Sequence, residues 1–79
     1  MDCPVCGTAA EDVTKQQSDC VTVRCPACGS YNISRSALSE KRWTELKPDQ
    51  RRKVMTVARQ RAEPGELPTI TTYMLPVLP

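Results

Sequence analysis

The sequence predicts a small α+β domain, with β-hairpins in residues 1–34, two helices in residues 35–63 and an extended C-terminal segment in residues 64–79. Three observations support this order. Valines alternate with polar residues between positions 21 and 24, as in a strand with one buried face. Apolar residues recur at helical spacing between positions 38 and 62. Prolines at positions 68, 76 and 79 exclude a long helix from the tail, and a chain of 79 residues should form a single compact unit.

A chain of this length rarely folds on a hydrophobic core alone. It contains no Phe, one Trp and two Tyr, so the large side chains that supply most burial energy are scarce. Another source of stability is therefore expected, which in small domains is a set of disulfides, a metal ion or a partner.

The cysteines indicate which of these three sources stabilises the chain. The chain has five cysteines and no histidine. Two near-copies of the motif Cys-Pro-x-Cys-Gly contain Cys3, Cys6, Cys25 and Cys28, with 18 residues between Cys6 and Cys25. This double spacing predicts a site in which four thiolates bind one zinc ion, each sulfur about 2.3 Å from the metal. Four protein ligands leave no open position for a catalytic water, so the zinc is expected to be structural.

The other residues of the motif suit the same site. Pro4 and Pro26 fix φ after the first cysteine of each pair and so restrict the unfolded chain. Gly7 and Gly29 can adopt positive φ, which allows backbone N–H groups to point at the sulfurs and offset their charge.

Three other uses of these cysteines compete with zinc. Disulfides are disfavoured because the chain starts without a secretory signal, and a cytoplasmic protein more often uses paired cysteines for metal. A redox Cys-x-x-Cys pair normally occurs singly beside a βαβ pattern, which this sequence does not have. An iron centre with four thiolates stays open, because the spacing does not distinguish the two metals.

The two motifs, CPVCG and CPACG around a short β-rich insert, resemble the zinc ribbon, a rubredoxin-like pair of zinc knuckles. The resemblance covers residues 1–34 and implies a structural zinc site with this fold. It implies little about function, because zinc ribbons occur in transcription factors, RNA polymerase subunits, ribosomal and replication proteins and protein-binding adaptors. The continuation, with residues 31–34, the helices and residues 66–71, is also similar to small uncharacterised bacterial and phage zinc-ribbon modules.

The expected helices have identifiable ends. Ser34 or Ser36 can cap a first helix that runs to about Leu46, with Leu38 and Trp43 among its apolar contacts and Trp43 in the core. Pro48 suits the first turn of a second helix, which should end at the Pro-Gly pair at positions 64 and 65.

Two further segments carry weaker signals. The tail between Thr69 and Leu75 is rich in strand-forming residues, so it should add an edge strand or lie extended across the helices. Its apolar residues are expected to pack on the domain or contact a partner: Tyr73, Met74, Leu75, Val77 and Leu78. Cys20 is interpreted as a free thiol on the ribbon, the alternatives being a reactive residue or a substitute for Cys25 as a ligand.

Basic residues concentrate in the helical segment. Residues 35–61 contain nine basic and three acidic residues, a balance of +6, whereas the segments before and after it each have a balance of −2. The candidate basic patch comprises Lys41, Arg42, Lys47, Arg51, Arg52, Lys53 and Arg59. Such a patch neutralises phosphates in nucleic-acid-binding proteins, although many charged helical faces are merely solvated.

The metal centre changes this balance. Four thiolates and one zinc ion add −2 to the formal charge of +2, so the metal-bound chain is neutral overall. The molecule becomes a charge dipole rather than a basic protein. We therefore expect a binding module that acts through a protein partner or nucleoprotein complex, such as an adaptor or a small phage-type inhibitor. The alternative is nucleic-acid binding through the basic helices. The chain has no histidine and no phosphate loop, and no pair of acidic residues sits in a context that suggests a cleft, so we expect no enzyme activity and no small-molecule substrate. No stretch approaches the roughly 18–20 apolar residues of a membrane span, so we expect no membrane association.

Overall fold

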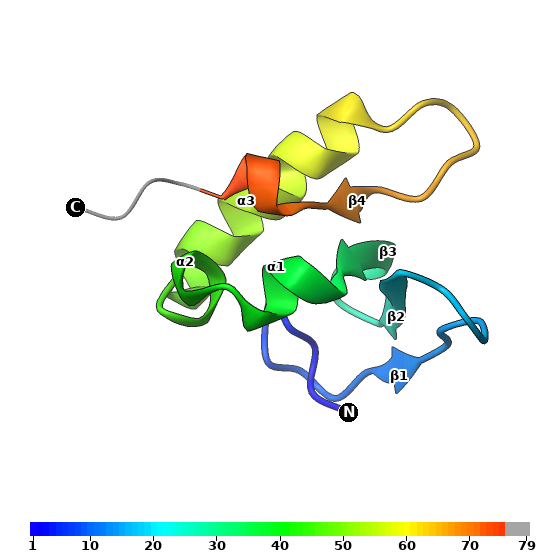
Figure 1. The fold of residues 1–79 in the computed structure, drawn as a ribbon, viewed down its shortest axis with the longest axis horizontal. Helices are drawn as coiled ribbons and strands as arrows, with labels where there is room; N and C mark the ends of the chain where they lie inside the picture. The colour runs from blue at the N-terminus through cyan, green and yellow to red at the C-terminus, as the bar shows by residue number, and fades with distance from the viewer. Residues whose placement is uncertain (76–79) are drawn as a thin grey trace.

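The computed structural model describes residues 1–75, in which a four-stranded sheet is packed against helices (Figure 1). The order of the elements is β1 (Glu11–Asp12), β2 (Cys20–Cys25), β3 (Gly29–Ser34), α1 (Arg35–Ser39), α2 (Lys41–Thr44), α3 (Pro48–Arg61), β4 (Thr69–Ile70) and the 3₁₀ turn η1 (Thr72–Met74). The expected α+β class, with strands before helices, is confirmed at this level.

The sheet is built on the β2–β3 hairpin. The strands are antiparallel, with Val23 opposite Tyr31 and Val21 opposite Ile33, and these four side chains are buried on one face. The alternation expected around positions 21–24 is therefore confirmed. The two-residue strand β1 pairs with β2 and extends the sheet on that side.

The tail adds an edge strand to the sheet, which is one of the two structures predicted for it. Strand β4 pairs parallel to β3, with Ile70 beside Ile33, and the backbone N–H of Asn32 donates to the carbonyl of Pro68 over 2.8 Å. Ile70 is fully buried. The sheet is therefore mixed, and residues from the two ends of the chain share one core.

The first predicted helix is interrupted. Ser34 caps α1 as expected, since its side chain accepts a bond from the N–H of Ala37, but the backbone at Glu40 is extended and α2 begins at Lys41. In one continuous helix, Ala37 and Trp43 would lie about 120° apart around the axis. Both side chains are buried in the same core, so the break lets Trp43 turn inward. Residues 1–75 thus contain three α-helices where two were predicted.

Helix α3 has the predicted start. Pro48 occupies its first turn together with Asp49, and the side chain of Gln50 accepts a bond from the N–H of Lys47 over 2.9 Å. Val54, Met55 and Ala58 form its buried stripe. After the helix, Gly65 has a φ of +85°, a conformation that favours glycine and reverses the chain toward β4.

The end of the tail is not fully extended. Residues Thr72–Met74 form a 3₁₀ turn, which points Tyr73 into solvent at 93% exposure and returns Leu75 to the core. The turn follows from the need to bury both Ile70 and Leu75, which are five residues apart. The predictions for Val77 and Leu78 lie outside the described residues.

Candidate metal centre

The first Cys-Pro-x-Cys-Gly motif forms a tight turn at the N-terminus. Asp2 and Ala9 bridge across it, the N–H of Cys3 donates to the carbonyl of Thr8 over 2.8 Å, and the N–H of Gly7 donates to the carbonyl of Cys3 over 2.9 Å. Gly7 has a φ of +78°, as expected for this position. The turn points Cys3 and Cys6 to the same side.

The second motif is the turn of the β2–β3 hairpin. Cys25 is the last residue of β2 and lies opposite Gly29, which begins β3 with a φ of +82°. This geometry directs the N–H of Cys28 at the sulfur of Cys25, 3.4 Å away. The expected donation of a backbone N–H to a ligand sulfur is therefore present at this motif.

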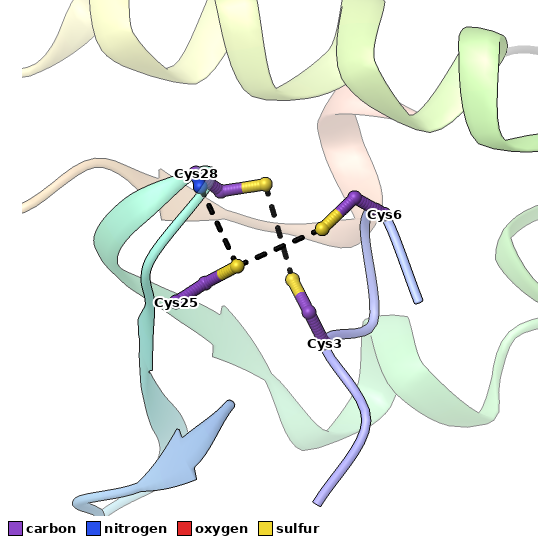
Figure 2. A group of neighbouring side chains, drawn as sticks. All are labelled: Cys3, Cys6, Cys25 and Cys28. Atoms are coloured by element: carbon purple, nitrogen blue, oxygen red, sulfur yellow. Dashed lines mark hydrogen bonds between the residues drawn. The ribbon is translucent and has the colours of Figure 1, made fainter. Parts of the chain in front are cut away.

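The four sulfur atoms converge on one point (Figure 2). All lie within 4.8 Å of one another, with Cys3 Sγ 3.9 Å from Cys28 Sγ and Cys6 Sγ 3.6 Å from Cys25 Sγ. A tetrahedral ion with bonds of about 2.3 Å separates its sulfurs by about 3.8 Å. The cluster therefore has the donor type, the number of donors and the spacing that a single zinc ion requires.

The pairing of the sulfurs also bears on the redox alternative. The two hydrogen-bonded sulfur pairs, Cys3–Cys28 and Cys6–Cys25, each join one motif to the other. Two independent redox pairs would each use both cysteines of one motif, whereas one shared ion needs all four sulfurs around one centre. The arrangement fits a shared ion better, and iron would fit the same four donors.

The two halves of the cluster differ in burial. Cys3 and Cys25 are buried, whereas Cys6 and Cys28 are half-buried on the side that faces α3 (Figure 2). The hydroxyl of Tyr31, itself fully buried, lies 3.0 Å from the sulfur of Cys3. Burial raises the pKa of Tyr31, which keeps the phenol protonated and able to donate to a thiolate.

In the metal-free chain, the cysteines differ in acidity. Hydrogen bonds from the side chain and backbone of Thr8 lower the pKa of Cys6 to about 6. Burial raises the pKa of Cys28. A bound cation would favour the thiolate form at every position, because metal binding releases the thiol protons.

Helix α3 is joined to both cysteine motifs by arginine. Arg51 donates to the carbonyl of Pro4 over 2.9 Å and to that of Thr44 over 3.2 Å, and its guanidinium lies 5.2 Å from the centroid of the Trp43 ring. Arg59 donates to the carbonyl of Cys28. Neither contact was predicted, because the sequence shows both residues only as members of a basic run.

The predicted basic patch does not form one continuous surface. Arg51 is half-buried and turned toward the core, Arg52 and Arg59 line a cleft beside Cys6 and Cys28, and Lys53 lines a groove on the opposite flank of α3. The remaining three residues precede α3: Arg42 pairs with Glu40 at 3.5 Å, while Lys41 and Lys47 are exposed. Positive side chains therefore point in at least two directions.

Cys20 is separate from the metal cluster. It begins β2, opposite Ser34, whereas the ligand Cys25 ends the same strand. It is half-buried, is a free cysteine and is not among the four residues that converge. This placement agrees with the expected free thiol.

Comparison with known proteins finds no matching protein-family model, no similar curated protein and no similar solved structure. Among residues 1–75, no helix is both long enough and apolar enough to cross a membrane.

Proposed function

We propose that the protein is a zinc-stabilised, non-catalytic binding module of the zinc-ribbon type that contacts a protein partner. The convergence of four sulfurs from two turns of like sequence is the observation that supports zinc and the ribbon. Four thiolates fill the coordination sphere, so the role proposed for the metal is structural. The thiolates would stay reduced in the cytoplasm, the compartment that we propose.

Metal analysis tests the zinc centre. The purified protein should contain a single zinc ion and no iron, and it should bind Co²⁺ with the absorption of a tetrahedral thiolate site. Cys6→Ser should lose the metal, whereas Cys20→Ser should retain it because Cys20 lies outside the cluster. Stoichiometric iron, or metal retained by Cys6→Ser, would contradict the proposal.

An exposed surface between α3 and η1 supports the protein partner. A groove of about 320 Å³ is lined by Gln50, Lys53, Val54, Val57 and Met74. Tyr73, the neighbour of Met74 in η1, is 93% exposed. Tyrosine and methionine are enriched in protein interfaces, and an aromatic side chain held this far into solvent contributes little to the stability of the isolated chain.

The groove favours one kind of partner. Val54, Val57 and Met74 supply apolar walls, and Lys53 supplies a positive charge at the same groove. We therefore propose an acidic partner segment that places an apolar side chain between α3 and η1 and a carboxylate near Lys53. An adaptor, or a small inhibitor of a larger complex, would act in this way.

Nucleic-acid binding through the basic helices is supported less well. Two of the seven patch residues, Arg51 and Arg59, donate hydrogen bonds to backbone carbonyls of the chain itself. The bound zinc centre would also cancel the net positive charge that non-specific binding to phosphates usually needs. Nucleic-acid binding is therefore tested alongside protein binding.

Point variants of the groove separate the two functions. Because Ile70 and Leu75 are buried, deleting the tail would disturb the core, so Tyr73→Ala and Lys53→Glu are used instead. Both should abolish capture of a partner from nuclease-treated cell extract by the zinc-loaded protein. Leu67→Ser, which removes an exposed apolar side chain that does not line the groove, should not.

A direct assay addresses the alternative. Labelled single-stranded and duplex DNA should show no salt-dependent binding to the wild-type protein at moderate ionic strength. If binding weakened steeply with salt and capture were lost on nuclease treatment, the partner would be nucleic acid and not protein.

A further inference from the structure

Helix α3 covers the more open side of the cysteine cluster. A cleft of about 310 Å³ lies between them, and the two half-buried cysteines, Cys6 and Cys28, are part of its lining. In Figure 2, the sulfurs of these two residues lie nearest the helix that crosses above the cluster. Any charge on the metal centre is therefore least shielded by protein on this side.

The same cleft is lined by two arginines, Arg52 and Arg59. Arg52 and Arg59 are separated by seven residues, or about two turns, and both lie on the flank of α3 that faces the cleft. Thr56 lies between them on that flank. The ion pair between Arg52 and Asp49, 3.4 Å long between largely exposed side chains, is too weak to hold Arg52 elsewhere.

The two arginines and the proposed metal–thiolate centre carry equal and opposite charges. Four thiolates and one zinc ion carry −2, and two arginines carry +2. Both arginine side chains are exposed, so their attraction to the half-buried sulfurs is screened by water and should weaken with salt. An anionic ligand in the same cleft would instead lie against the thiolates, which disfavours that use of the arginines.

We propose that Arg52 and Arg59 are counter-ions of the metal–thiolate centre and increase its affinity for zinc. The inference rests on the proposed zinc site and adds to it. It assigns these two arginines to metal retention rather than to partner binding, although the sequence places them in one basic run with Lys53. Neither arginine binds the ion directly, and both act on it through its thiolate ligands.

The test compares two double variants of the full-length protein. Arg52→Gln/Arg59→Gln removes the proposed counter-ions. Lys47→Gln/Arg61→Gln makes the same change in net charge at the two ends of the same helix, at exposed residues that line neither the cleft nor the proposed partner groove. Zinc affinity is measured by competition with a chelator at fixed pH and at low and high salt.

The counter-ion variant should bind zinc about tenfold more weakly than the wild type, since the loss of groups around metal ligands typically costs 10- to 100-fold. The difference should shrink at high salt. The control variant should stay within about twofold of the wild type. Equal losses in both variants, or no loss in the first, would overturn the proposal.

Two more measurements separate charge from structure. Arg52→Lys/Arg59→Lys keeps both charges and should recover most of the affinity, whereas failure to recover it would assign the effect to the Arg59–Cys28 hydrogen bond. Far-UV circular dichroism of the zinc-saturated variants checks that each is folded. Absence of zinc binding in the wild type would refute the zinc site itself, whereas wild-type binding without a selective loss would refute only the counter-ions.

Discussion

At the scale of single residues, the centre depends on side chains outside the cysteine motifs. Tyr31 is the clearest case, because its hydroxyl lies 3.0 Å from Cys3 Sγ while its ring is buried in the sheet. The sequence predicts a strand at this position but gives no sign that its tyrosine faces a ligand. The hairpin register sets Tyr31 opposite Val23 on the buried face, and the first cysteine turn packs in the same core, which brings Cys3 to the hydroxyl.

Tyr31→Phe is therefore expected to destabilise the zinc-loaded protein by about 1.5 kcal/mol, the usual value of a hydrogen bond to a charged group. The substitution keeps the ring and removes only the hydroxyl, so packing should change little. Denaturant unfolding at saturating zinc measures the effect. Tyr73→Phe is the matched control and should change stability by less than about 0.5 kcal/mol, because that side chain is 93% exposed.

Gly29 offers a second test at this scale. Its φ of +82° is one that residues with a Cβ rarely adopt, yet a Cβ placed there would meet no atom within 4 Å. Gly29→Ala should therefore cost about 1 kcal/mol through backbone strain alone. The loss should appear in zinc affinity as well as in unfolding, since the turn sets the position of Cys28. Unchanged stability would show that the turn can adopt another conformation.

At the scale of elements, the sequence was sufficient where a local pattern determines the structure. Alternation predicted β2, and Pro48 predicted the start of α3. The break at Glu40 was missed because no proline or glycine marks it. It results from the burial of both Ala37 and Trp43, which depends on contacts distant in sequence.

The candidate site also has a part that local sequence predicts and a part that it does not. The cysteine spacing predicted the cluster, because a two-residue gap and a following glycine constrain the chain locally. Helical spacing places Arg52 and Arg59, seven residues apart, on one face, and both line the cleft, but it does not show which of the flanking residues turns toward the core. On α3, neighbouring residues point about 100° apart, so Arg51, Arg52 and Lys53 face the core, the cleft and the opposite groove respectively.

The position of Arg51 leads to an element-scale prediction. This residue links α3 to the first cysteine turn and to α2 through two carbonyls, and it lies over the ring of Trp43. Arg51→Gln should lower the free energy of unfolding by about 2 kcal/mol, after allowance for its partial exposure. Lys53→Gln on the same helix should change it by less than about 0.5 kcal/mol. If chemical denaturation showed equal losses of stability for Arg51→Gln and Lys53→Gln, Arg51 would be an ordinary surface residue of the basic patch.

At the scale of the whole molecule, the cysteine cluster and the hydrophobic core are one structure. Cys3 and Cys25 belong to the buried cluster that also contains Trp43 from α2, Met55 from α3 and Ile70 from β4. A structural zinc ion contributes on the order of 10 kcal/mol to folding, which is comparable with the entire net stability of a typical domain. Loss of the ion should therefore affect elements far from the cysteines in sequence.

Chelation is accordingly expected to unfold α3 together with the cysteine turns. The helix has 14 residues, a length at which an isolated helix is marginal in water, and its buried stripe packs on the core that includes the ligands. Far-UV circular dichroism should lose the helical signal when a strong chelator is added and recover it when zinc is restored. Cys6→Ser should resemble the chelated protein, whereas Cys20→Ser should resemble the wild type. A helical signal that persists under chelation would mean that α3 and the tail fold without the metal, and that zinc orders only the N-terminal turns.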